Sequence, residues 1–178
     1  MKLLEKNYKR IVIKVGSSLF YSQMNKLDTS LLELIVAQVS QLRKEKKEII
    51  MVTSGAIALG MSVIGLESKP KQLSKLQAIA AIGQSELMNK YRELFKIRGI
   101  NCAQILLTWE DFDQRPRYLN AKNTLLTLLK LGSIPIINEN DTISTDEIKF
   151  GDNDRLSALV ASLVNAGLLI ILSDVDGL

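Results

Sequence analysis

Hydrophobic residues along the chain form short runs that alternate with longer stretches of helical periodicity. The runs Arg10–Val15 and Ile49–Val52 are rich in β-branched residues and end at glycine or small polar residues, as buried strands do. Three further runs predict strands at Ile100–Leu107, Ile134–Ile137 and Leu168–Leu172. We therefore expect strands separated by stretches long enough to hold helices.

The intervening stretches carry apolar residues at helical spacing. Asp28 can cap a helix whose apolar face is formed by Leu31, Ile35, Val39 and Leu42. Further helices are predicted after the second strand to about Ile64, and over Leu73–Ile97, Arg117–Leu131 and Arg155–Asn165. Gly83 lies inside the longest of them at a cost of about 1 kcal/mol relative to alanine, which is more typical of a close-packing site than of a ligand site.

Alternating strands and helices predict parallel βαβ units. The expected fold is α/β, a three-layer αβα sandwich with a mainly parallel central sheet. The 178 residues contain no internal repeat, low-complexity segment or Pro/Ser-rich linker, so a single domain over residues 1–178 is expected.

Composition excludes several kinds of chemistry. The chain has no histidine and one cysteine, Cys102, so it cannot form a Ser-His-Asp or Cys-His nucleophile, a His-ligated zinc site or an intramolecular disulfide. Cys102 lies in an apolar run and is expected to be a buried core thiol, in a reducing, cytoplasmic setting. Chemistry must come from lysine, arginine, carboxylates, amides, hydroxyls and backbone groups.

Charge and hydropathy exclude two classes of partner. The net charge is +4, only 5% of residues are aromatic, and no basic stripe is interleaved with aromatic residues, so no nucleic-acid partner is expected. The N-terminus lacks the apolar core of a signal peptide, and the longest apolar stretch, near Leu168–Leu172, is too short to span a bilayer. We expect no membrane association.

Small polar residues follow the predicted strands at their carboxyl ends, where open parallel sheets bind ligands. Gly16-Ser17-Ser18 follows the first strand and Thr53-Ser54-Gly55-Ala56 the second. Asn138–Asp141 follows the fourth strand, and Ser173–Gly177 the last. This coincidence predicts a ligand site along that edge of the sheet.

Lys14, inside the first strand, fits two roles. It can extend into solvent from an edge strand, or its ammonium can join the backbone N–H groups of the Gly16 turn in holding a polyphosphate. The run Gly55–Gly60 has P-loop glycine spacing but continues with Met61-Ser62, and no G-x-G-x-x-G occurs. A nucleotide site would therefore be of another kind.

The polar segment Asn138–Asp154 leaves two kinds of site open: a carboxylate-lined metal site, or an amino-acid site in which Asn and Asp hold an ammonium and a carboxylate. Asp152 or Asn153 can equally be the N-cap of the helix that follows. The segment lacks the ligand spacing of a calcium-binding loop, which makes the metal site the weaker of the two alternatives. No metal ligand is assigned.

Five motifs together resemble the amino acid kinase family, and within it the glutamate 5-kinases. They are Val12–Ser18, Val52–Gly60, Asn138–Asp141, Glu147–Asp154 with Leu156–Ala158 after it, and Leu172–Leu178. The resemblance runs from about Arg10 to the last residue. The Thr-Ser-Gly-Ala-Ile-Ala run together with Gly-Asp-Asn-Asp separates the chain from carbamate, aspartate and uridylate kinases.

This resemblance implies an ATP-dependent phosphotransferase with a carboxyl group as acceptor. ATP and L-glutamate would give ADP and L-glutamyl 5-phosphate, the first step of proline biosynthesis, with Mg²⁺ as cofactor. It further implies feedback inhibition by L-proline and a homo-oligomer, a dimer or tetramer.

The resemblance also implies roles for single residues. Lys14 matches the catalytic lysine that contacts the nucleotide phosphates and the group in transfer, and Asp154 matches the acidic residue that holds the active-site lysines. The matched glutamate-binding positions are Ser54, Gly55, Asn138, Asp141, Asp152 and Asn153. The matched ATP-binding positions are Lys14, Gly16, Ser173 and Asp174.

The chain departs from the family at its end. A segment that completes the nucleotide site, with a glycine-rich turn and a second catalytic lysine, does not occur within the 178 residues. We therefore expect the glutamate-binding part and the start of the ATP-binding part of an amino acid kinase domain, truncated at its C-terminus. The alternatives are a short relative, a non-catalytic glutamate- or proline-binding regulatory module, or the kinase half of a bifunctional pyrroline-5-carboxylate synthase.

Overall fold

The structure, a computed structural model, describes residues 7–17, 29–144 and 153–173. The strands are β1 (Arg10–Val15), β2 (Glu48–Thr53), β3 (Cys102–Leu107), β4 (Ile134–Glu139) and β5 (Leu168–Leu172). The helices are α1 (Thr29–Lys44), α2 (Ala56–Val63), α3 (Leu73–Lys96), α4 (Glu110–Asp113), α5 (Arg115–Lys130) and α6 (Asn153–Leu163). Each predicted strand is confirmed, with ends that differ by no more than two residues.

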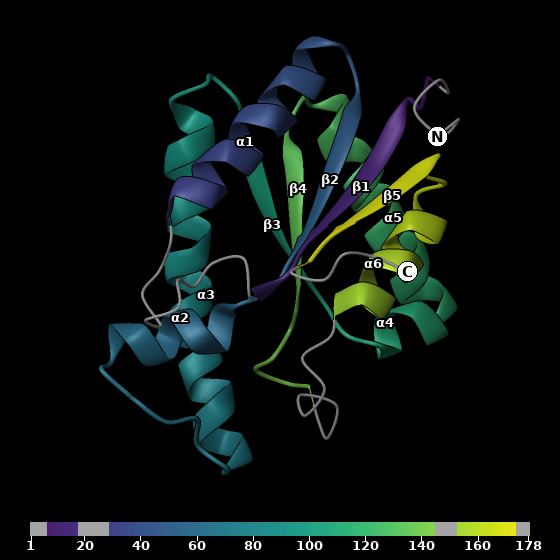
Figure 1. Cartoon of the computed structure of the whole chain (residues 1–178). Helices are drawn as coiled ribbons and strands as arrows, with labels where there is room; N and C mark the ends of the chain where they lie inside the picture. The colour runs from purple at the N-terminus through teal and green to yellow at the C-terminus, as the bar shows by residue number, and fades with distance from the viewer. Residues whose placement is uncertain (1–6, 18–28, 145–152, 174–178) are drawn as a thin grey trace.

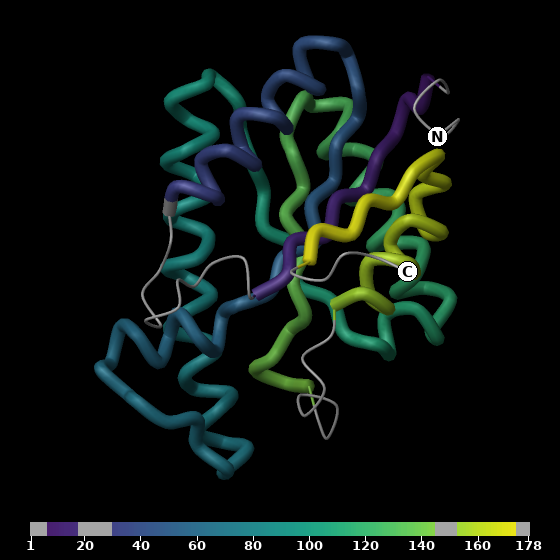
Figure 2. Tube along the Cα trace, in the orientation of Figure 1, coloured from purple at the N-terminus to yellow at the C-terminus, as the bar shows by residue number. Residues whose placement is uncertain are grey.

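All described strand pairs are parallel, which confirms the predicted α/β fold. The order across the sheet is β3-β4-β2-β1-β5. The first and last strands of the chain are neighbours, as the purple and yellow traces in Figure 2 show, with Val15 paired to Leu172. The carboxyl ends of β1, β2 and β4 consequently lie next to one another at one edge of the sheet.

Helices cover both faces of the sheet, with α1, α2 and α3 on one side and α4, α5 and α6 on the other (Figure 1). The strands alternate between the two faces. In β1, Ile11, Ile13 and Val15 join the core cluster under α1 and α3, whereas Val12 joins the cluster under α5 and α6. This alternation places Lys14 on the face of the sheet that α6 covers. It also determines which helix each site residue contacts.

Three helices differ from the sequence prediction, and one of them is α6, which spans Asn153–Leu163 rather than Arg155–Asn165. The four-residue helix α4 was not expected, because a single turn is too short to show a hydrophobic period. Helix α5 begins at Arg115 rather than Arg117, with proline in its first turn, a position that proline favours. The predicted cap Asp28 lies outside the described residues.

Cys102 packs against the core under α1 and α3 but is half-buried rather than fully buried as predicted, and burial raises the pKa of its thiol. Among the described helices, none combines the length and apolar character needed to cross a bilayer.

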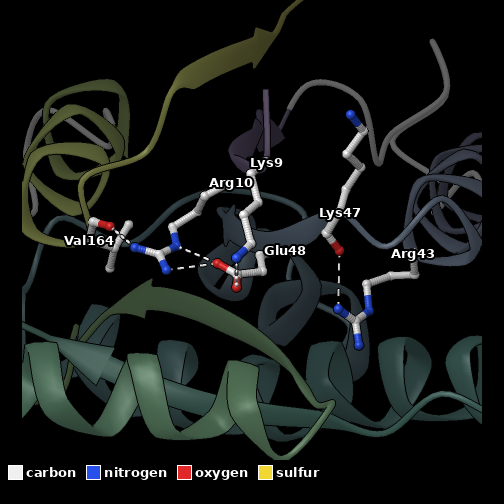
Figure 3. A network of polar contacts seen from close by, with 6 residues as sticks. All are labelled: Lys9, Arg10, Arg43, Lys47, Glu48 and Val164. Atoms are coloured by element: carbon white, nitrogen blue, oxygen red, sulfur yellow. Dashed lines mark hydrogen bonds and ion pairs between the residues drawn. The ribbon is translucent and has the colours of Figure 1, made fainter. Parts of the chain in front are cut away.

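An ion-pair network holds the amino ends of β1 and β2 together (Figure 3). Glu48 accepts from Arg10 Nε at 2.8 Å and pairs with Arg10 Nη2 at 2.7 Å. Arg10 also donates to the backbone carbonyl of Val164, just past the end of α6, and Lys9 lies 3.8 Å from the Glu48 carboxylate. The network therefore ties both strands to the last helix at the edge opposite the strands' carboxyl ends.

Glu48→Gln is expected to lower the free energy of unfolding by about 1 kcal/mol, because Arg10 keeps a hydrogen-bond acceptor but loses its partly buried counter-charge. Chemical denaturation measures this change. The matched control is Glu45→Gln, an exposed residue just beyond α1, which should leave stability unchanged. Equal losses in both variants would show that the Arg10 network adds nothing.

Candidate active site at the carboxyl edge of the sheet

Lys14 is a buried cation at the carboxyl end of β1. The strand is paired on both sides, with Lys14 opposite Val52 of β2 and Ile171 of β5, so the edge-strand interpretation of this lysine is wrong. Its side chain is 9% exposed, and Nζ lies 2.6 Å from Oδ1 of Asp154 in the first turn of α6. A lysine in this position is held by its counter-ion and cannot extend freely into solvent.

The end of β2 turns sharply into α2. Gly55 has φ 99°, a left-handed conformation that glycine adopts without steric cost, and α2 begins at the next residue, Ala56. Ser54 is buried beside this turn. The first N–H groups of a helix have no intrahelical partner, so this turn presents donors and the positive end of a helix dipole.

Two asparagines join three elements at the centre of the site. Asn153 Nδ2, from the start of α6, shares its two hydrogens among three acceptors: Asn138 Oδ1 of β4 and Ser54 Oγ, each at 2.9 Å, and the Thr53 carbonyl of β2. Asn138 and Asn153 are both buried. Asn153 is the first residue of α6 rather than the residue before it, and its amide nitrogen cross-links the strand ends.

A cavity of about 170 Å³ opens beside these groups. This is below the roughly 300–1,000 Å³ of pockets for drug-sized ligands and suits a small metabolite. It brings together five of the predicted glutamate-binding positions, Ser54, Gly55, Asn138, Asp141 and Asn153. Lys14 and Asp154 do not line this cavity, although Asp154 directly follows Asn153.

Carboxylates make one wall of the cavity acidic. The pKa of Asp141 is raised to about 6, mainly by burial and in part by the nearby Glu139 carboxylate, while Lys69 acts in the opposite direction. Glu139 accepts a hydrogen bond from Ser144 Oγ at 2.6 Å, which fixes its position. Two carboxylates in a small cavity favour a ligand that carries a positive charge.

The predicted ATP-binding positions lie at the neighbouring strand ends. Gly16 N donates to the Leu172 carbonyl at 3.2 Å, so Gly16 and Ser173 follow directly paired residues of β1 and β5. Two predicted site residues, Asp152 and Asp174, lie outside the described residues.

The acidic and cysteine side chains that the structure describes form no metal site of their own. Over residues 7–17, 29–144 and 153–173, no three acidic or cysteine side chains cluster closely enough to hold an ion. Mg²⁺ in kinases needs only one or two carboxylates, because substrate phosphates supply the other ligands. We therefore assign no metal ligand in this chain.

Sequence reasoning missed two groups at the cavity and one behind it. Lys69 comes from the irregular connection between α2 and α3, which has no periodic pattern to reveal it. Glu139 was recognised only as part of an acidic segment. Gln84 of α3 accepts a hydrogen bond from Asn138 Nδ2 at 2.8 Å. The sequence feature that could have revealed it is a polar residue on the apolar face of a predicted helix.

Comparison with known proteins gives one consistent result. Residues 9–178 match the amino acid kinase family. A glutamate 5-kinase of Marinomonas sp. (strain MWYL1) is 52% identical over 180 residues, covering 100% of this chain and 48% of the relative. A glutamate 5-kinase of Thermus thermophilus is 54% identical over 170 residues, covering 96% of this chain and 46% of the relative.

A glutamate 5-kinase of Burkholderia thailandensis is similar to the same extent, at 52% identity over 178 residues, covering 100% of this chain and 48% of the relative. The chain spans about half the length of these curated relatives.

Proposed function

Because the chain belongs to the amino acid kinase family, we propose that it carries the glutamate site of a glutamate 5-kinase. In this proposal the whole protein transfers the γ-phosphoryl group of ATP to the side-chain carboxylate of L-glutamate. The observation that carries it is the cavity in which Ser54, Asn138 and Asn153 are cross-linked beside two carboxylates.

The charges of the cavity suit both ends of an amino acid. Asp141 and Glu139 favour the α-ammonium of glutamate, while the N–H groups at the start of α2 and the Lys69 ammonium favour a carboxylate. A neutral sugar or a purely anionic metabolite would leave the acidic wall without a counter-charge.

Lys14 is proposed to act on the phosphoryl group in transfer. The attacking carboxylate and the γ-phosphate are both anionic, and at about 4 Å with an effective dielectric near 20 each unit pair repels by roughly 4 kcal/mol. A buried ammonium held by Asp154 offsets that repulsion without moving during the reaction. The acceptor carboxylate is already ionised at neutral pH, so the transfer needs no general base and a histidine-free chain is suited to it.

ATP is the proposed phosphoryl donor, and Gly16 and Ser173 would lie along its phosphates. Mg²⁺, when bound to the nucleotide, would neutralise developing charge on the phosphates. Proline inhibition and a homo-oligomeric state belong to the same proposal through the family resemblance, and a cytoplasmic location belongs to it through the single cysteine.

Calorimetric titration of the chain with L-glutamate tests the site and its pH dependence together. Asp141 must be ionised to hold an ammonium, and its pKa is about 6, so affinity should be about tenfold weaker at pH 5 than at pH 8. In Asp141→Asn, glutamate should bind more weakly at pH 8 and lose most of this pH dependence. Absence of L-glutamate binding by the wild-type chain would contradict the proposal.

The same substitution has an opposite effect on stability. A carboxyl whose pKa is raised by folding destabilises the folded state once pH exceeds its unfolded pKa, and the penalty grows until pH passes about 6. Asp141→Asn should therefore raise the unfolding free energy at pH 7.5 by about 3 kcal/mol, which corresponds to a pKa raised from 3.8 to about 6, and leave it nearly unchanged near pH 3.5. Replacing a residue that has only a structural role would not weaken ligand binding and at the same time stabilise the fold.

A further inference from the structure

Gln84 occupies an unusual place in α3, because it lies among the residues that this helix buries. Its neighbours on the buried face are Ala80, Gly83, Leu87 and Tyr91, and Gln84 itself is 9% exposed. A buried amide costs free energy unless each polar atom is hydrogen-bonded. Within the described part of the chain, Gln84 Nε2 has no hydrogen-bond partner, so fold stability does not account for a glutamine here.

Backbone groups fix the orientation of each amide in the cluster. The Glu139 N–H donates to Asn138 Oδ1 at 2.9 Å, and a backbone N–H can only donate, so the oxygen of Asn138 must face it. Asn138 Nδ2 then faces Gln84 Oε1 at 2.8 Å. Asn153 is oriented in the same way, because the Thr53 carbonyl can only accept from its Nδ2. Gln84 Nε2 is therefore turned away from Asn138.

The strand alternation explains why α3 reaches this point. Ile134 and Ile136 of β4 point to the α3 face, and Asn138 continues that series two residues later. Asn138 is the residue on which the others converge, since its Oδ1 accepts from both Glu139 N and Asn153 Nδ2. Gln84 itself does not line the cavity.

We infer that Gln84 is a positioning residue of the amino-acid site: its Oε1 holds the Asn138 amide, and through it Asn153, in the orientation that binds the substrate. The inference rests on the proposed function. Gln84 touches no substrate and acts only through Asn138.

Gln84→Met separates this role from a structural one. Methionine keeps the volume and apolar contacts of the side chain but removes the acceptor, so Asn138 can rotate and release Asn153. Affinity for L-glutamate should fall about tenfold. The melting temperature should stay nearly unchanged, because the substitution removes one buried donor without a partner, Gln84 Nε2, and leaves another, Asn138 Nδ2, without its acceptor.

Two further variants test whether the effect passes through Asn138. In an Asn138→Ala background, adding Gln84→Met should change affinity by less than about twofold, because residues that act as one unit are not additive. Gln84→Glu keeps an oxygen facing Asn138 Nδ2 whether ionised or protonated, and should bind L-glutamate within about threefold of the wild type.

Tyr91→Phe is the matched control. Tyr91 lies on the same buried face of α3, and its hydroxyl is 3.0 Å from Thr53 Oγ1, outside the amide cluster. This variant should melt at a lower temperature with affinity within about twofold of the wild type.

Calorimetry and thermal melting on these variants of the chain decide the matter. If the wild type binds L-glutamate and Gln84→Met binds it equally well, or if Gln84→Met loses stability as Tyr91→Phe does, Gln84 is not a positioning residue. If the losses of affinity caused by Gln84→Met and Asn138→Ala are additive in the double variant, the positioning role of Gln84 is also wrong. Failure of the wild type to bind L-glutamate would overturn the proposed function and this inference together.

Discussion

Turnover is expected to fall about a thousandfold when Lys14 is replaced by methionine in the whole protein. The residue is a buried cation at the point where β1 and β5 end together, and its ammonium is held 2.6 Å from Asp154. Losing about 4 kcal/mol of electrostatic stabilisation of the transition state corresponds to a rate about a thousandfold lower. ADP release in the presence of L-glutamate and Mg-ATP measures the change.

Glutamate binding should change little in the same variant, because Lys14 does not line the amino-acid cavity. Lys9→Met is the control: it removes an exposed lysine just before the other end of the same strand and should keep normal turnover. Asp154→Ala should also be severely impaired, since Lys14 then loses the carboxylate that orients it. Near-normal turnover in Lys14→Met would show that Lys14 does not take part in phosphoryl transfer.

Gly83→Ala is expected to destabilise the fold by about 3 kcal/mol, although alanine is a better helix former than glycine by about 1 kcal/mol. The reason is a backbone contact between α2 and α3. A Cβ at position 83 would lie 1.8 Å from the Ala56 carbonyl oxygen and 2.4 Å from Gly60 N. Backbone atoms cannot move aside as a flexible side chain can, so the two helices must separate.

The same separation would displace the start of α2, which forms one wall of the cavity, so glutamate affinity should fall with stability. Ser85→Ala is the matched control, an exposed position of the same helix at which alanine should be neutral or slightly stabilising. Thermal melting and denaturant titration measure both variants. An increase in stability on Gly83→Ala would contradict the close approach of the helices.

The strands could be predicted from the sequence because each is a short apolar run, and β1, β2, β4 and β5 are each followed by small polar residues. The run Leu168–Leu172 has the same bounds in the structure. Gly83 was likewise interpreted correctly as a close-packing residue, because a glycine inside a long helix has a cost that packing must offset. These features depend on neighbours in the chain, which a sequence pattern records.

The order of the strands is not a local property, and the sequence therefore left Lys14 undecided between an exposed edge and a buried site. Pairing with β5, whose residues come last in the chain, decides that question. The ion pair with Asp154 depends on α6 covering the same face of the sheet as Lys14. Lys69 and α4 could not be predicted for a different reason: an irregular loop and a single helical turn show no hydrophobic periodicity.

The central claim is that this chain holds the site at which a glutamate side-chain carboxylate receives a phosphoryl group. Trapping with hydroxylamine tests it most directly, because an acyl phosphate reacts with hydroxylamine to give a stable hydroxamate. Incubating the whole protein with L-glutamate, Mg-ATP and hydroxylamine should yield the γ-glutamyl hydroxamate together with ADP, and Lys14→Met should yield almost none. ADP formation that does not depend on glutamate and leaves no hydroxamate would contradict the account.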